Sequence, residues 1–126
     1  MFITLEPDSP VPIFEQLHDG ILAAIASGDL RDGDRLDPVR KVAADFGINP
    51  ATVKKAYDQL AEEGIIETRG RSGSVVRLGV GASPSAASEL ERELARALTR
   101  ARAQGFAASD IRLIIDHNLA TLKNLP

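Results

Sequence analysis

The stretch from Leu36 to Tyr57, LDPVRKVAADFGINPATVKKAY, has the pattern of two short helices joined by a tight turn. Asn49 is a favourable helix N-cap, and Pro50 follows it at the first helical position, where a missing N–H costs nothing. Behind that start, apolar residues recur at helical spacing and give the second helix one buried face. The stretch therefore predicts a helix-turn-helix whose second helix leaves small residues and lysines outward at its front: Ala51, Thr52, Lys54 and Lys55.

The residues before this stretch predict one longer helix and a connection. Apolar side chains from Ile13 to Ser27 share one face, and Gly28 ends the helix. We expect residues 2–5 to form a short edge strand and residues 29–35 to be rich in turns. Asp37 is expected to cap the helix that follows, with Pro38 at its first position.

A β-hairpin is expected directly after the helix-turn-helix. The β-branched runs 65–69 and 74–78 flank Gly70-Arg71-Ser72-Gly73, which supplies the turn. Three helices and a hairpin make a winged helix-turn-helix, so we predict a mainly α (α+β) fold with this domain at residues 1–78. The small residues of 79–85 predict a linker.

Residues 86–126 predict two more helices. Ser88 and Glu91 form a capping-box pattern, and a start nearer Ser85 is the alternative. In the first of these helices acidic residues come early and basic residues late, the order that the helix dipole favours. Two such helices cannot enclose a core, so their apolar faces need the first domain or a second copy of the chain, and the flexible linker favours a second copy. The residues expected at that dimer interface are Leu90, Leu94, Leu98, Ile111, Ile114, Ile115, Leu119 and Leu122.

The composition argues against several classes of protein. Apolar residues make up 44% of the chain, enough for a core, and the absence of cysteine excludes disulfides and thiolate metal sites. No apolar run could cross a membrane and no signal peptide is apparent, so we expect a cytoplasmic protein without a membrane partner. His18 and His117 are isolated, and the sequence contains no catalytic triad pattern or phosphate-binding glycine loop. We therefore expect no metal, no cofactor and no enzyme activity.

The net charge of −3 opposes binding to nucleic acid, but its distribution along the chain does not. Residues 1–28 contain four acidic side chains and no basic one, and the basic residues begin at Arg31. Binding responds to the local field near the phosphates, so one basic face is sufficient. Asp58, Glu62 and Glu63 occupy the rear of the second helix of the helix-turn-helix, so only the front of that helix can face DNA.

Residues 12–76 resemble the N-terminal DNA-binding domain of the GntR family of bacterial transcriptional regulators. The matching pieces are the Gly28-x-Leu30 turn, Gly33-Asp34-Arg35-Leu36, Val39-Arg40-x-Val42-Ala43, NPATVKKAY, and Glu63-Gly64-Ile65-Ile66. The Asn49-Pro50-x-Thr52-Val53 form and the short C-terminal segment resemble the YtrA subfamily, in which two C-terminal helices serve dimerisation. The resemblance implies a homodimeric repressor of transcription that binds double-stranded DNA. Two copies with half-sites about one helical turn apart predict a palindromic operator.

The resemblance also implies which residues contact DNA. Arg40 matches a family arginine that reaches the DNA, and Lys54 lies where an arginine of the recognition helix usually sits. The family's wing tip, here Gly70 and Arg71, enters the minor groove, and Lys55 and the wing arginines are expected at phosphates. The DNA-binding residues expected in this way are Arg40, Asn49, Pro50, Ala51, Thr52, Lys54, Lys55, Arg69, Gly70 and Arg71.

Two other functions stay open on the sequence alone. One is a winged helix that serves as a protein-interaction module, and the other is a regulator that responds to an unknown small-molecule effector bound at the dimer interface. The dependence of binding on salt separates DNA from an apolar protein partner. Thermal stabilisation in a metabolite screen would reveal an effector.

Overall fold

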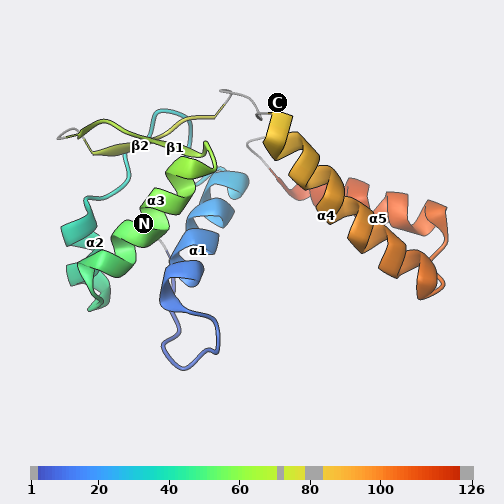
Figure 1. Ribbon diagram of the computed structural model, residues 1–126, viewed down its shortest axis with the longest axis horizontal. Coiled ribbons are helices and arrows are strands. Elements are labelled where there is room, and N and C mark those ends of the chain that lie inside the picture. The colour runs from blue at the N-terminus through green and yellow to red at the C-terminus, as the bar shows by residue number, and fades with distance from the viewer. Residues whose placement is uncertain (1–2, 71–72, 79–83, 123–126) are drawn as a thin grey trace. The chain divides into compact units, whose positions relative to one another are not determined.

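The computed structural model of the protein describes residues 3–70, 73–78 and 84–122 (Figure 1). Contacts within the chain divide it into two compact units, one within Met1–Val80 and one within Gly81–Lys123. The described part of the first unit holds three helices and a β-hairpin, and that of the second holds two helices. The fold is mainly α with a small sheet, as the sequence predicts.

The first unit is a winged helix-turn-helix. Its elements follow in the order α1 (Ile13–Ser27), α2 (Val39–Phe46), α3 (Pro50–Glu62), β1 (Ile66–Thr68) and β2 (Ser74–Val76). The two strands pair antiparallel, with Ile66 opposite Val76. An isolated bridge joins Arg35 to Val75, so the segment before α2 runs along the hairpin. The hairpin was predicted from the sequence, whereas the bridge at Arg35 was not.

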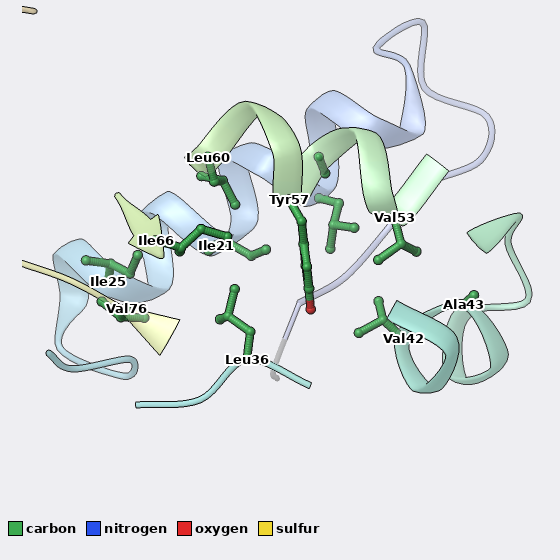
Figure 2. Packing of buried hydrophobic residues seen from close by; sticks show 12 residues of the cluster. Ile21, Ile25, Leu36, Val42, Ala43, Val53, Tyr57, Leu60, Ile66 and Val76 are labelled. Carbon is green, nitrogen blue, oxygen red and sulfur yellow. The ribbon is translucent and has the colours of Figure 1, made fainter. Parts of the chain in front are cut away.

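The core of this unit lies between α1, α3 and the hairpin (Figure 2). Leu17 and Ile21 of α1 and Leu60 of α3 have no exposed surface, and α2 adds Val42. The face of α3 predicted to be buried is confirmed at all of its positions, Val53, Ala56, Tyr57 and Leu60. Burying one large aliphatic side chain contributes about 1.5–3 kcal/mol, so this cluster holds α3 in one orientation.

The turn between α2 and α3 depends on two residues that have special backbone roles. Gly47 has a φ of 66°, a left-handed conformation that favours glycine, and the N–H of Ile48 donates to the Ala43 carbonyl at 3.0 Å. Asn49 then caps α3, because its Oδ1 accepts from the N–H of Ala51 at 2.9 Å. The predicted cap and the predicted Pro50 start are both confirmed.

Two expectations at the start of the chain and of α2 are wrong. Residues 3–5 form no strand; a Cβ on Gly20 would lie 2.7 Å from Cγ2 of Ile3, so Ile3 instead packs directly on α1. Phe2 lies outside the described residues. The cap position of α2 belongs to Pro38, which is extended (φ −58°, ψ 148°), and no side chain caps this helix. Asp37 therefore precedes the cap, and its carbonyl accepts a hydrogen bond from the Tyr57 hydroxyl at 2.6 Å.

The second unit is a helical hairpin of α4 (Pro84–Ala103) and α5 (Ala108–Thr121). Helix α4 begins inside the segment expected to be a linker, because Pro84 suits a first helical turn. Ser88 therefore lies within the helix and does not cap it, and the alternative start near Ser85 is the better one. Residues 79–83 of the expected linker lie outside the described residues.

The apolar side chains of the second unit are largely uncovered. Helix α4 has no buried residue, and α5 has one, Ile111. No helix in the described ranges combines the length and hydropathy that a bilayer requires. The large apolar residues exposed on the two helices are Leu90, Leu94, Leu98, Leu113, Ile114 and Ile115, and Leu119 as well; Leu122, just after α5, is exposed too.

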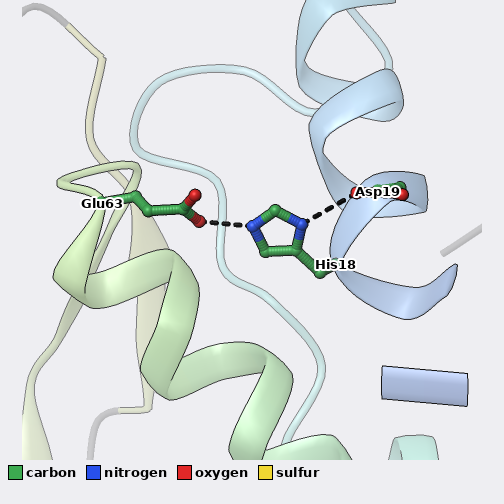
Figure 3. Close-up of polar contacts among 3 residues, drawn as sticks. All are labelled: His18, Asp19 and Glu63. Carbon is green, nitrogen blue, oxygen red and sulfur yellow. Dashed lines mark hydrogen bonds and ion pairs between the residues drawn. The ribbon is translucent and has the colours of Figure 1, made fainter. Parts of the chain in front are cut away.

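A buried histidine joins α1 to the end of α3 (Figure 3). The His18 side chain is 10% exposed; its Nδ1 lies 3.0 Å from Oδ1 of Asp19, and its Nε2 contacts Oε1 of Glu63. Burial lowers the pKa of His18, but the hydrogen bonds to Asp19 and Glu63 and the charges of these carboxylates outweigh it and raise the pKa above its usual value. The protonated ring can donate from both nitrogens, one to each carboxylate.

We expect the stability of the first unit to depend on pH through His18. Because its pKa is raised in the folded state, its stabilising contribution is complete below the unfolded pKa, about 6.5, and is lost as pH rises through the folded pKa. Glu63→Gln should destabilise the protein at pH 6 and much less at pH 9. Urea unfolding across this range measures the difference, with His117→Gln as the exposed control. A Glu63→Gln deficit that is the same at every pH would contradict this reading.

Candidate nucleic-acid interface

The outer face of α3 is basic at its front and acidic at its rear. Lys54 and Lys55 are exposed in the second turn, and Asp58 and Glu62 are exposed behind them. The Nζ of Lys54 lies 2.6 Å from Oδ2 of Asp58, an ion pair between two exposed side chains. Such a pair stabilises by at most about 1 kcal/mol, so a DNA contact can replace it.

Lys55 is held by a ring from another helix. Its Nζ lies 3.8 Å from the centroid of the Phe14 ring, where α1 begins. The Phe14 side chain is half-buried, and its ring face contacts this cation. An exposed cation–π contact contributes about 0.5–1 kcal/mol, and it leaves the ammonium able to donate elsewhere.

The backbone of the first turn of α3 is already hydrogen-bonded. The N–H of Ala51 donates to the Asn49 side chain, and the N–H of Thr52 donates to the Asn49 carbonyl at 2.9 Å. Pro50 has no N–H. Side chains are therefore the groups available to DNA at this end: the half-exposed Thr52 hydroxyl and the two lysines.

Arg40 lies exposed on the second residue of α2. The nearby carboxylates of Asp37 and Asp45 are contacted by Lys41, whose Nζ lies 3.9 Å and 2.8 Å from them. Among the residues that the structure describes, none forms an ion pair with Arg40. Its guanidinium is therefore available to an external acceptor.

The start of α2 is fixed against α3 by Tyr57, through the hydroxyl bond to the Asp37 carbonyl. Burial, and after it the charge of Asp37, raises the pKa of Tyr57, so the hydroxyl stays protonated and keeps donating. A neutral hydrogen bond of this kind contributes about 1 kcal/mol. Arg40 and the front of α3 consequently belong to one rigid surface.

The wing is described in part. The Nε of Arg69 lies 3.7 Å from Oε1 of Glu67, and Nη1 of Arg77 lies 3.2 Å from Oε2 of the same residue. Glu67 therefore offsets part of the positive charge of Arg69. Gly70 has a φ of 55° at the edge of the turn, and Arg71 lies outside the described residues.

Arg35 is a further basic residue, and it is not among the DNA contacts expected from the sequence. A cleft of about 570 Å³ separates the start of α2 from the hairpin, and Arg35 lines it together with Thr68 and Gly70. The bridge to Val75 and the hydrogen bond from the Leu36 N–H to the Ser74 carbonyl, both contacts between distant segments, bring Arg35 there. No local pattern could have shown this placement.

The described residues include no cluster of side chains with the composition of a metal site. No group of three His, Asp or Glu side chains among them could hold a metal ion. The helix-turn-helix instead carries exposed cations, Arg40, Lys54 and Lys55, and the half-exposed hydroxyl of Thr52, and the hairpin follows it. Such a surface can contact phosphates and base edges.

Comparison with known proteins shows which family the residues of this surface belong to. The profile described as "Bacterial regulatory proteins, gntR family" matches residues 13–76. The chain is 44% identical over 70 residues to the HTH-type transcriptional repressor YtrA of Bacillus subtilis, which covers 55% of this chain and 54% of that protein. The chain thus spans about half the length of this curated relative.

Solved structures agree with this assignment. A GntR-family transcription factor named YtrA from Sulfolobus acidocaldarius has a TM-score of 0.64 and 34% identity, covering 79% of this chain and 99% of that one. A protein from Listeria monocytogenes described as a transcriptional antiterminator has a TM-score of 0.78 and 26% identity, covering 94% and 90%. Both likenesses extend beyond the 64 residues of the family profile.

Proposed function

The chain belongs to the gntR family of bacterial regulatory proteins and is a YtrA-like, DNA-binding transcriptional regulator, and we propose that it acts as a homodimeric repressor at a palindromic operator. The name of the Bacillus subtilis relative supports the direction of regulation, repression. A protein that acts on the bacterial chromosome works in the cytoplasm, which is the proposed location.

The observation that carries the DNA contact is the exposed cationic front of α3 beside Arg40. In the proposed complex α3 enters the major groove by its N-terminal residues, as helix-turn-helix proteins do, and the wing enters the adjacent minor groove. Arg40 and Lys54 read bases. Lys55, Thr52 and the wing residues Arg69 to Arg71 contact the phosphates and the minor groove, and the cap of Asn49, Pro50 and Ala51 sets the approach of the helix.

The proposed homodimer rests on the second unit. Its exposed leucines and isoleucines would be costly to leave in water, and a second copy of the same unit is the partner always present with it. Two copies place two recognition helices on one face of the duplex, with half-sites about one helical turn, ~34 Å, apart.

Selection of bound sequences from a random duplex pool tests the proposal. We expect an inverted repeat, two chains per duplex, and an affinity that falls steeply between about 50 and 200 mM salt as counterions are released. Binding that hardly changes with salt would favour a protein-interaction module. A selected sequence without a repeat, bound by one chain, would contradict the dimeric operator complex.

A further inference from the structure

The charges of α4 follow its apolar stripe in a regular order, and no charged side chain in the described part of the chain pairs with them. Glu89, Glu93, Arg96 and Arg100 recur at intervals of four, three and four residues, so they lie along one flank of the stripe formed by Leu90, Leu94 and Leu98. All four charged side chains are exposed, and within the described part of the chain none forms an ion pair.

The helix dipole accounts for only one of these four charges, Arg100, which lies in the last turn of α4. The dipole acts within the first and last turns, and α4 begins at Pro84 with no acidic residue in its first turn. Glu93 and Arg96 lie near the middle of the helix, where the effect has faded. The spacing of four residues also joins like charges, Glu89 with Glu93 and Arg96 with Arg100, and these two pairs destabilise an isolated helix, whereas Glu93 and Arg96, three residues apart, favour it.

The apolar face beside these charges is only partly covered by α5. A groove of about 210 Å³ runs between the two helices, and every residue that lines it is apolar, among them Leu94, Leu98, Phe106 and Ile114. Ile111 is buried against α4, whereas Leu94 is 46% and Ile114 is 51% exposed. The groove therefore needs an occupant that is apolar along its centre and charged along its edge.

We propose that the occupant is α4 of a second copy, packed antiparallel to the first about a two-fold axis near Leu94. An antiparallel pair brings equal flanks together, so Glu93 faces the partner's Arg96 and Glu89 faces the partner's Arg100. The stripe matches in the same register, because Leu90 faces the partner's Leu98 and the two Leu94 side chains meet. The same surface serves both copies, as a two-fold interface requires.

A parallel pair has the opposite electrostatic consequence. It would place the acidic half of one helix beside the acidic half of the other, and the basic half beside the basic half, which costs free energy. The charge order of α4 thus selects the direction of pairing, while the apolar stripe supplies the attraction. This inference rests on the homodimer proposed above and adds its geometry.

Charge exchange in the full-length chain tests the direction of pairing. Three variants are needed. The first combines Glu89→Arg and Glu93→Arg, the second combines Arg96→Glu and Arg100→Glu, and the third carries all four substitutions. In the antiparallel dimer each double variant replaces attraction by repulsion at every cross-chain pair. The dimer Kd from sedimentation equilibrium at low salt should then rise about tenfold to a hundredfold.

Two complementation results are expected from the same variants. An equimolar mixture of the two double variants should form heterodimers, and the fourfold variant should dimerise within about threefold of the unmodified protein. These results also show that the variant helices fold. The differences should shrink at about 1 M salt, where the charges are screened.

Failure of this geometry is distinguishable from failure of the homodimer. Double variants that self-associate as tightly as the unmodified protein at low salt would overturn the antiparallel pairing and leave the dimer intact, because only an antiparallel pair brings this flank against the same flank of the partner. An unmodified chain that stays monomeric at concentrations well above 10 µM, roughly the range in which specific dimers form, would overturn both.

Discussion

The variant Leu94→Glu with Ile114→Glu is expected to be monomeric and to bind its operator about a hundredfold or more weaker than the unmodified protein. Both side chains line the apolar groove of the second unit, and both are about half exposed in the single chain. A carboxylate there is solvated in the monomer but would be buried without a partner in the dimer, which costs several kcal/mol.

The loss of operator affinity follows from the loss of bivalent binding. Linking two DNA-binding units makes the second contact intramolecular, which raises affinity by about 10²- to 10⁴-fold. Titrations against the full operator and against a single half-site separate the two effects. The variant should bind both duplexes with the affinity that the unmodified protein shows for a half-site.

Leu113→Glu is the matched control, because it places the same charge on α5. Leu113 is 67% exposed and does not line the groove. This control should remain dimeric with unchanged operator affinity. If the double variant also stays dimeric, the apolar groove is not the dimer interface.

Local signals in the sequence predicted most of the first unit. A cap followed by proline, a glycine after the last apolar residue and a regular apolar spacing each act over only a few residues. Helix α3 and its Asn49 cap follow from such signals, and so do the end of α1 at Gly28 and the hairpin of β1 and β2. These features depend on interactions between residues that are close together in the sequence.

Local signals failed where two of them competed. Asp37 is a good capping residue, but Pro38 can occupy either the N-cap position or the first position of the helix. The structure takes the first option, because the Asp37 carbonyl then meets the Tyr57 hydroxyl of α3. A tertiary contact decided a boundary that the local pattern left open.

Contacts between distant segments could not be predicted from the sequence. Phe14 and Lys55 are brought together by the packing of α1 on α3, and Arg35 reaches the hairpin through its bridge to Val75. His18 likewise reads as an isolated residue until Glu63 lies beside it. The sequence therefore predicted that the candidate site lies at the front of α3. It did not predict which residues contact the cations of that site.

Lys54→Ala is expected to weaken operator binding by about 1–3 kcal/mol per half-site, about fivefold to 150-fold, and to relax the preference at one base pair. The ion pair with Asp58 does not prevent this contact, because an exposed pair is worth at most about 1 kcal/mol. Asp58→Ala should act in the opposite direction and tighten binding, since it frees Lys54 and removes a negative charge near the phosphates.

Lys41→Ala is the matched control for Lys54, since Lys41 also pairs with an aspartate four residues on, at 2.8 Å from Asp45. Its removal should change affinity less than about threefold and leave base preference unaltered, as for an exposed charge outside the contact surface. Competition titrations with single-base operator variants measure both quantities. The double variant Lys54→Ala, Arg40→Ala tests both base contacts in an electrophoretic shift assay. If it binds operator DNA as tightly as the unmodified protein does, the two cations proposed to read bases contribute nothing to recognition, and the assignment is wrong.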